Sequence, residues 1–445
     1  MALYTGAGKG YTLLSARREG GVTMDLPAIS PRDRGILRDL ARHQAELAAK
    51  EENRERVALW YAHNDGQGSR PMLHLELGTF AQEVIEPRLR CQDPAARAIE
   101  RRLYENFANQ EFFDDDRVTP DYFAVHYDSG FVPFGLEVQV EHTAARDGLA
   151  SLGHHFVEQI ADLEEDYHKL GPSRFFASAE GLGEKIAYVE ELLGDILPVR
   201  AEMDALYSVP TQYLLHLMSM ETMLYAMCDC PELFLKVMDQ IAEDTCAYYR
   251  LLEEKGLIWP TNGHNGLGQG TWCYTRQLPG PEAGRPLTTR DVWGFLDSQE
   301  TVGISPQMYE ELVFPCYRKI AENFGRLSYG CCEPVHPIWE RCLSKLPNLG
   351  KVSISPWCDE TYMGERLRGT KIIYHRKPSP NFLGVGEHLD EEALRKHIRA
   401  TVQAARGCRL EVTQRDVYTI HHDVGKARRY VEILREETEE AYGKA

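Results

Sequence analysis

Short apolar runs that alternate with helical segments constrain the fold of this chain more than any other feature. In the second half the runs are "LIWP", "VWGFLD", "RLSYG", "KVSIS", "KIIYH" and "CRLEV", and each ends in a polar or Gly-containing loop. Parallel strands need long crossovers of this kind between them. With earlier runs at 70–77, 122–130 and 174–179, the count of about eight predicts a single (β/α)8 barrel. No glycine-rich phosphate-binding loop opens any helix, so a nucleotide-binding fold has no support.

The barrel is expected over residues 60–445, with two segments ahead of it. Residues 1–23 are rich in glycine and lack periodicity, which predicts a flexible extension. Residues 24–59 are expected to hold one solvated, charge-laced helix, with Ser30 as its N-cap and Pro31 as its first residue. This exposed helix offers a contact for a homodimer.

Charge and hydropathy limit the partners. The net charge of −18 over 445 residues argues against a nucleic-acid or anionic-membrane surface, because both need clustered Lys and Arg. No apolar run approaches the ~20 residues that cross a bilayer. The N-terminus also lacks the residue order of a secretory signal. We therefore expect a cytoplasmic protein with small-molecule or protein partners, whose 11 cysteines are reduced thiols.

Polar residues gather just past the predicted strand ends. In a barrel these positions share one cup at the carboxyl ends of the strands, where active sites are found. The residues are Asn262, His264, Asn265, Gln299, Glu300, Cys331, Cys332, Glu333, His336, Cys358, Asp359, His375, Arg376, Lys377 and Asp416. Aromatic residues near the same ends, Trp357 among them, would let the cup stack a planar substrate.

The stretch "SYGCCE" at 328–333 raises the choice between core filler and a metal site. A buried cysteine is often only a small hydrophobic residue, and two adjacent cysteines are not a CxxC signature. Adjacent residues on a strand point to opposite faces, so only one of Cys331 and Cys332 is expected to face the barrel interior.

Two longer stretches resemble the uroporphyrinogen decarboxylase superfamily. They are "SQETVGISPQMYEELVFPCYRKIAENFGRLSYGCCEP" and "PTQYLLHLMSMETMLYAMCDCPELFLKVMDQIAEDTCAYY", and a weaker similarity extends over residues 60–440. In that superfamily an acidic residue near one strand end precedes a strand that ends in His-x-Cys or a variant. The superfamily includes zinc-dependent methyltransferases that move methyl groups between small substrates, corrinoid proteins and thiols such as coenzyme M.

The resemblance implies a zinc site. Cys331 occupies the cysteine of the His-x-Cys position, where Tyr329 replaces the histidine, and Cys408 in "RGCRLEVT" occupies the later cysteine. Glu333 is the third ligand in this assignment, while Cys332, His336 and His264 stay open as alternatives. Two cysteines and one further ligand would leave zinc an open position for substrate.

The implied activity is a zinc-dependent methyltransferase that moves a methyl group between a small methylated substrate and a separate corrinoid protein. Aromatic methyl ethers, which would undergo O-demethylation, and methylamines are both compatible substrates. The chain has no DxHxxG-type cobalamin-binding motif, which implies that a partner carries the corrinoid. Glu300, Asp416 and Tyr329 are then the expected catalytic residues, with the acids protonating the departing oxygen or nitrogen. The expected substrate-binding residues are His264, Asn262, Trp357, His375 and Arg376.

Two other functions stay open. A metal-independent decarboxylase of the uroporphyrinogen decarboxylase type would use the same barrel. Its N-terminal arginine-rich motif, which pairs with substrate carboxylates, is missing from "WYAHNDGQGSRPMLHLE", where only Arg70 lies nearby. A barrel that binds a small molecule or a corrinoid protein without turnover is the second alternative, because fold does not dictate function.

Overall fold

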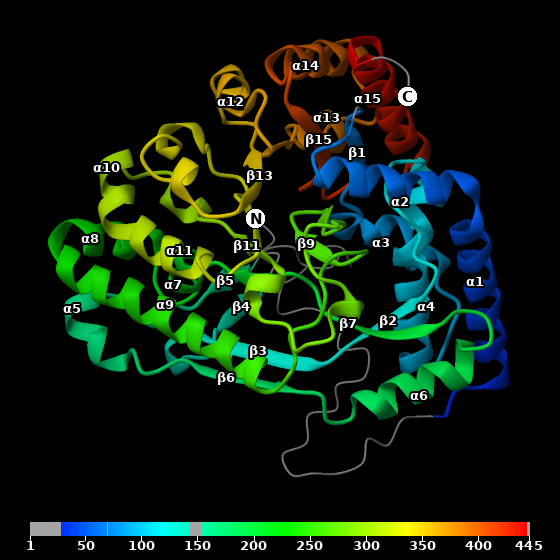
Figure 1. Cartoon of the computed structure of the whole chain (residues 1–445), viewed down its shortest axis with the longest axis horizontal. Helices are drawn as coiled ribbons and strands as arrows, with labels where there is room; N and C mark the ends of the chain where they lie inside the picture. The colour runs from blue at the N-terminus through cyan, green and yellow to red at the C-terminus, as the bar shows by residue number, and fades with distance from the viewer. Residues whose placement is uncertain (1–27, 69, 143–153, 443–445) are drawn as a thin grey trace.

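The computed structural model describes residues 28–68, 70–142 and 154–442, arranged as a mixed α/β molecule (Figure 1). The predicted extension 1–23 lies outside the described residues. The central element is a seven-stranded parallel sheet, which confirms the predicted βα alternation. Its strands, in spatial order, are β1 (Met72–Leu75), β15 (Arg409–Gln414), β14 (Ile373–Arg376), β13 (Leu349–Ile354), β12 (Arg326–Tyr329), β11 (Trp293–Leu296) and β8 (Leu206–Ser208).

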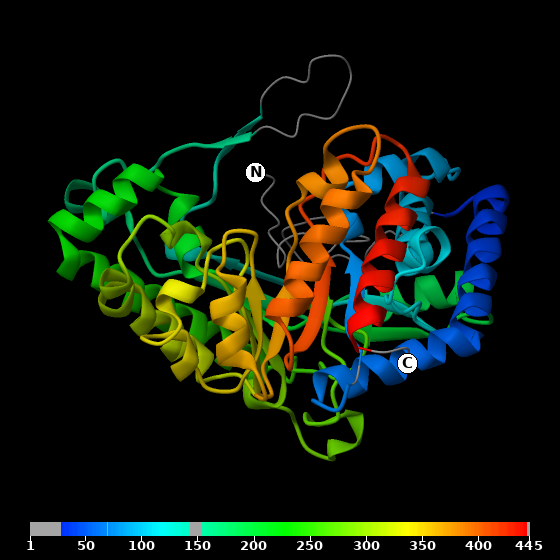
Figure 2. The same ribbon diagram turned by 90° about the horizontal axis from the view of Figure 1, so that it is seen from above.

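Helices follow most of these strands and cover the outer face of the sheet (Figure 2). The longer ones are α8 (Met220–Asp229), α9 (Pro231–Glu254), α11 (Phe314–Ala321), α12 (Glu360–Leu367), α14 (Glu391–Ala404) and α15 (Val424–Tyr442). The shorter ones are α3 (Ala81–Val84), α5 (Leu163–Asp166), α7 (Pro210–Leu215), α10 (Pro306–Met308) and α13 (Asn381–Gly384). Local sequence sets their ends. Pro231 begins α9, and Gly256, with a φ of 64°, follows its end.

A bent strand extends the sheet toward a second, smaller one. β7 (Val199–Glu202) pairs in parallel with β2 (Phe123–His126). β8, which is separated from β7 only by residues 203–205, pairs in parallel with β11. β7 and β8 therefore act as two halves of one strand. Read this way, eight strands follow one another in the order expected of a barrel.

We call the resulting arrangement of β2, β7–β8, β11, β12, β13, β14, β15 and β1 the ring. The ring stays open between β1 and β2, so the described strands do not form the predicted closed barrel. Side chains occupy the free edge of β1 instead of a neighbouring strand. The backbone N–H of Leu73 donates to Asp116 Oδ2 at 2.8 Å, and that of Leu75 donates to Asp115 Oδ2 at 2.8 Å. Asn109 Nδ2 donates to the Leu75 carbonyl at 2.9 Å. Because buried backbone groups need partners, these contacts end the sheet at β1.

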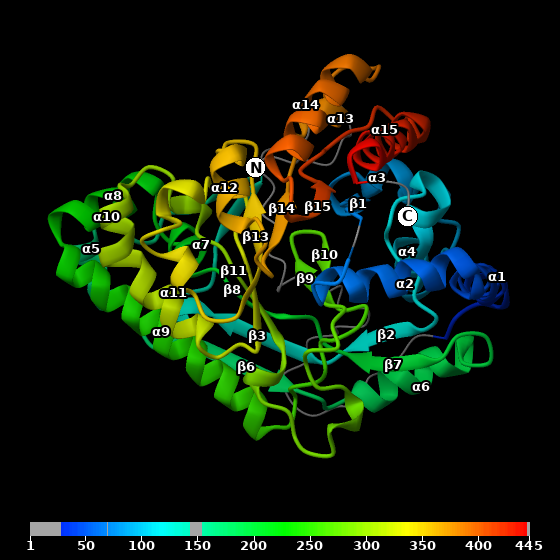
Figure 3. The ribbon, with the colours of Figure 1, turned by 45° about the horizontal axis from the view of Figure 1, so that its top comes forward.

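A two-stranded hairpin, β9 (Gly266–Gly268) and β10 (Thr271–Trp272), fills the interior of this ring (Figure 3). The Thr271 hydroxyl accepts from Lys351 Nζ of β13 at 2.6 Å, and Gln269 Oε1 accepts from Lys377 Nζ, just past β14, at 2.9 Å. The predicted strand "LIWP" is wrong, since residues 257–265 contain no strand. The chain instead enters the ring as this hairpin.

Two antiparallel pairs lie outside the ring. β3 (Asp128–Val132) pairs with β6 (Arg174–Ser178), and β4 (Val140–His142) pairs with β5 (His154–Phe156). The predicted strand at 174–179 therefore exists but does not join the parallel sheet.

The N-terminal part holds two helices, not one: α1 (Pro31–Ala49) and α2 (Glu51–Asn64). The predicted cap is confirmed, because Ser30 Oγ accepts from the Asp33 backbone N–H at 3.2 Å. α1 is only partly solvated, since it packs against α4 (Pro94–Ala108) and α6 (Leu182–Leu193). Within the described ranges, no helix is both long and apolar enough to cross a membrane.

Candidate active site at the carboxyl ends of the strands

Strand alternation carries a set of charged side chains to one end of the ring. Because every second residue of a strand points inward, the last inward position of each strand falls at its carboxyl end. The turns beyond β11, β12 and β15 add further groups. We call the resulting group the cup: Glu76, Asp297, Glu300, Cys331, Cys332, Lys377, Arg415 and Asp416.

Two adjacent thiols lie side by side in the cup. Cys331 Sγ and Cys332 Sγ are 3.5 Å apart, and Cys332 Sγ is 3.5 Å from Asp416 Oδ2. Arg415 Nη1 donates to Cys331 Sγ at 3.5 Å. The prediction that only one thiol faces the interior is wrong, because Gly330, with a φ of 101°, turns the chain beyond the strand end, where alternation no longer applies.

The Cys331 thiol is held in its neutral form. The hydrogen bond with Cys332, followed by burial, keeps the pKa of Cys331 well above its ordinary value. Arg415 and Lys377 oppose this shift without overcoming it. A ligand that withdraws the proton, such as a soft metal ion, would therefore change the charge of the cup.

Two buried carboxyl groups of the cup have an oxygen without a hydrogen-bond partner, Asp297 Oδ1 and Glu300 Oε1. Burial, reinforced by the negative charge of Glu333, raises the pKa of Asp297 well above its ordinary value. Burial likewise raises the pKa of Glu300 to about 7, although the Thr211 hydroxyl donates to Glu300 Oε2 at 2.8 Å. Both groups can therefore hold a proton near neutral pH and donate it.

The cup also contains two buried basic residues, Arg415 and Lys377. Arg415 Nε lies 3.1 Å from Glu76 Oε2, and Arg415 Nη2 lies 3.2 Å from Asp416 Oδ1. Lys377 Nζ donates to Gln269, and it makes no ion pair with any residue that the structure describes. Burial lowers the pKa of Lys377. Because Lys377 makes no ion pair among the described residues, it can bind an anionic group of a substrate, whose charge would favour the protonated amine.

The predicted zinc ligands Cys331, Cys408 and Glu333 do not come together. Cys408 immediately precedes β15 and its Sγ donates to the Gly364 carbonyl at 3.3 Å, so it lies at the amino end of the strand. β15 has six residues and therefore spans about 20 Å. Cys331 lies at the opposite end, which excludes one ion bound to both thiols. The Glu333 oxygens already accept from the backbone N–H groups of Ser298 and Cys331, at 3.1 and 2.8 Å.

Two other predicted site residues point away from the cup. The Tyr329 hydroxyl is buried between Ser298 Oγ at 2.5 Å and the Tyr309 hydroxyl at 2.7 Å. Arg376 Nη2 pairs with Glu360 Oε1 of α12 at 2.6 Å. Both side chains occupy the outward positions of their strands, under the covering helices. Tyr329 as a catalytic residue and Arg376 as a substrate ligand are therefore corrected to core residues.

The remaining predicted residues are scattered. The Asn262 carbonyl accepts from the Thr275 N–H at 3.1 Å, in the segment that leads to and from the hairpin, and His264 stacks on Trp272 with ring centroids 4.3 Å apart. Neither belongs to the cup. Trp357 is 65% exposed, in the loop after β13. Glu300 and Asp416 are the predicted catalytic residues that the structure places in the cup.

His375 belongs to a polar layer one step below the cup. His375 Nε2 lies 2.6 Å from the Thr413 hydroxyl, and His74 Nε2 lies 3.2 Å from Glu411 Oε1. The ligand atoms of His74, His375 and Glu411 are close enough together to hold a metal ion. However, Lys351 Nζ donates to Glu411 Oε2 at 2.8 Å. The buried ammonium already supplies the positive charge that a metal ion would bring, so this layer fits a metal poorly.

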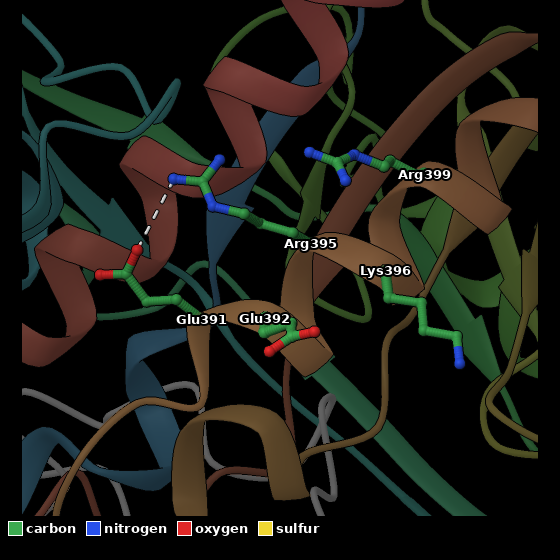
Figure 4. A pocket seen from close by; sticks show the side chains of 5 residues that line it. All are labelled: Glu391, Glu392, Arg395, Lys396 and Arg399. Atoms are coloured by element: carbon green, nitrogen blue, oxygen red, sulfur yellow. Dashed lines mark ion pairs between the residues drawn. The ribbon is translucent and has the colours of Figure 1, made fainter.

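A hollow on the surface of α14 is not a site. It measures about 530 Å³ on the outer face of α14 (Figure 4). Its lining consists of Glu391, Glu392, Arg395, Lys396 and Arg399. Arg395 Nη2 lies 3.6 Å from Glu391 Oε2, a helical pair one turn apart. Arg395 and Arg399 also pair with Glu437 of α15, so these charges serve the contact between α14 and α15.

Asp297, Arg415, Glu76 and Gln269 belong to the cup or contact it, and sequence reasoning missed them. For the first three a signal exists, because each lies two residues beyond an inward residue of its strand: Phe295, Thr413 and His74. Counting in steps of two from these positions would have found them. Gln269 had no such signal, since the hairpin was not predicted.

Comparisons with known proteins add little. No protein-family model matches this chain, and no curated protein matches it. Among solved structures, a methyltransferase from Methanosarcina mazei is 12% identical, with a TM-score of 0.46, over 87% of this chain and 99% of that chain. A "Putative Vitamin-B12 Independent Methionine Synthase" from Listeria monocytogenes is 12% identical, with a TM-score of 0.29, over 57% of this chain and 68% of that chain. Likenesses this remote carry no argument about the site.

Proposed function

We propose that the cup is the active site of a methyltransferase acting on a small methylated substrate, such as an aromatic methyl ether or a methylamine. The observation that carries the proposal is Asp297, a buried acid with an open oxygen, in the same cup as the paired thiols Cys331 and Cys332. Breaking a CH3–O or CH3–N bond leaves a basic atom behind. A proton donor at that atom accelerates such a step by about 10²–10⁴-fold.

Three cup residues have defined roles in this scheme. Lys377 binds an anionic group of the substrate, and Asp297 gives its proton to the departing oxygen or nitrogen. Glu300, with a pKa of about 7, supplies the next proton. The methyl group passes to an acceptor outside the chain, for which a separate cytoplasmic corrinoid protein is proposed. The missing cobalamin-binding motif supports that assignment.

A zinc ion in this cup would be held by Cys331, Cys332 and Asp416 instead of the set expected from the sequence. The 3.5 Å between the two sulfur atoms suits two Zn–S bonds of about 2.3 Å. When bound, zinc would supply Lewis-acid polarisation of the substrate. Arg415 and Lys377 would balance the two thiolates.

The test is single-turnover methyl transfer with a panel of methyl ethers and methylamines and free cob(I)alamin as acceptor. Asp297→Asn keeps the shape of the side chain and removes its proton, so we expect the rate to fall at least ~100-fold. Asp239→Asn, which alters a carboxylate that pairs with Lys319 on the surface, is the matched control and keeps the parent rate. Equal rates in the two variants would exclude Asp297 as the acid.

A decarboxylase is the second candidate, and Lys377 favours it. A buried ammonium without an ion pair among the described residues, next to Arg415, suits a substrate carboxylate. A protonated Asp297 could then deliver a proton to the carbon that loses CO2. Release of CO2 in the presence of a chelator, without methyl transfer, would favour this function over the first.

A further inference from the structure

A cavity separate from the cup lies next to the hairpin. It measures about 140 Å³ and lies between the β2–β7 pair and the hairpin. Its lining includes Arg102, Arg117, Tyr122, Glu202, Asp204 and Trp272. None of these residues belongs to the cup.

Three side chains with metal-ligand chemistry meet beside this cavity, and two of them, Glu202 and Asp204, line it. His126 ends β2 and is the register partner of Glu202, which ends β7, and Asp204 follows two residues later. Their ligand atoms all lie within 4.8 Å of one another. His126 Nε2 is 3.8 Å from Asp204 Oδ2. Parallel pairing of β2 and β7 thus dictates the arrangement.

The surrounding contacts orient the two carboxylates without neutralising them. The Tyr122 hydroxyl donates to Glu202 Oε2 at 2.5 Å, and the Gly266 N–H donates to Asp204 Oδ1 at 2.7 Å. Among the described residues, no Lys or Arg lies within ion-pair distance of either carboxylate. Glu411 in the polar layer differs, because Lys351 pairs with it.

The structure also leaves one nitrogen atom of this cluster without a hydrogen bond. His126 Nε2 is shielded from solvent and has no hydrogen-bond partner. A buried carboxylate and an unpaired imidazole nitrogen that face the same space are costly unless a ligand binds both.

We propose that His126, Glu202 and Asp204 bind one divalent transition-metal ion, of the class of Mn²⁺, Co²⁺ or Zn²⁺, at a site separate from the cup. One imidazole nitrogen favours these ions over Mg²⁺ and Ca²⁺, which prefer oxygen ligands. Two carboxylates balance the double charge.

The test is titration of the metal-free full chain with Co²⁺, followed by visible absorption and calorimetry. It is done in a Cys331→Ser, Cys332→Ser background, so that binding at the cup thiols does not contribute. We expect one equivalent of Co²⁺ with a spectrum of nitrogen and oxygen ligands. His126→Ala and the near-isosteric Glu202→Gln should each weaken binding at least 100-fold. His388→Ala, which removes an exposed histidine, should leave it unchanged.

Three results would overturn the proposal. The first is no Co²⁺ bound in the double-serine background, and the second is unchanged affinity in both His126→Ala and Glu202→Gln. The third is weak binding at many sites, which His388→Ala would also reduce. Thermal unfolding of the metal-free variants checks their fold. If His126→Ala unfolds, Glu202→Gln alone decides. The outcome is independent of methyl transfer by Asp297→Asn, so the two proposals stand or fall separately.

Discussion

At the scale of single residues, burial decides which carboxyl groups of the cup can act as acids. Glu300 and Asp416 follow the ends of two strands of one sheet, yet Glu300 is 1% exposed whereas the Asp416 side chain is 30% exposed. Desolvation penalises the charged form only where water is excluded. This places the proton donors of the cup at Asp297 and Glu300, near the end of β11, and leaves Asp416 beside the thiols.

Glu300 gives the stability a defined pH dependence. Its pKa rises from 4.5 to about 7 on folding, so between these values the folded protein binds more protons than the unfolded chain. The free energy of unfolding should therefore fall as pH rises from 5 to 8, with Glu300 contributing about 2–3 kcal/mol of that fall. Urea unfolding of the parent and Glu300→Gln at both pH values isolates this share. Parallel pH profiles would contradict the assignment.

Two neighbouring residues at the end of β14, Arg376 and Lys377, should respond differently to substitution. Arg376→Met leaves Glu360 without its ion pair, so we expect a loss of about 3 kcal/mol in unfolding free energy. Lys377→Met removes the free charge of the cup and should raise the substrate KM while changing stability less. Chemical denaturation and steady-state kinetics of both variants check this. A larger KM effect in Arg376→Met would reverse the assignment of the two faces.

At the scale of elements, the β9–β10 hairpin is the feature that the sequence did not predict. The run "LIWP" was apolar enough to suggest a strand, but tertiary packing overrides such a preference. The stretch "GLGQGTW" carried the better signal, because closely spaced glycines permit a tight hairpin turn. Gly268, Gln269 and Gly270 have φ values of 87°, 55° and 75°. Only the structure shows that this turn enters the ring and meets Lys377.

Gly270 should tolerate a side chain poorly. Its φ is 75°, and a Cβ there would lie 3.0 Å from Thr413 Cγ2. Gly256 is the matched control, with a φ of 64° and open space around it. Gly256→Ala should cost about 1 kcal/mol from backbone strain alone. Gly270→Ala should cost more in thermal unfolding and also lower the activity of the cup, and equal costs would mean that the hairpin is not packed in the ring.

At the scale of the whole molecule, the parallel order of the strands was predictable and the closure of the ring was not. Alternating apolar runs and helices predict parallel neighbours locally. The ring stays open between β1 and β2 because Asp115 and Asp116 accept hydrogen bonds from the edge of β1. The spacing of these residues in the sequence does not predict that contact. The predicted zinc set failed for a related reason. Resemblance to a motif predicts the identity of a ligand but not the end of the strand at which it lies, and Cys408 lies at the amino end of β15.

The central claim is that the paired thiols and the acids beside them form the active site, while Cys408 takes no part. Single-turnover methyl transfer by the Cys331→Ser, Cys332→Ser double variant and by Cys408→Ser tests it most directly. The account predicts a rate at least 100-fold below the parent in the double variant and the parent rate in Cys408→Ser. A double variant as active as the parent, or a Cys408→Ser variant that loses activity while folded, would contradict it.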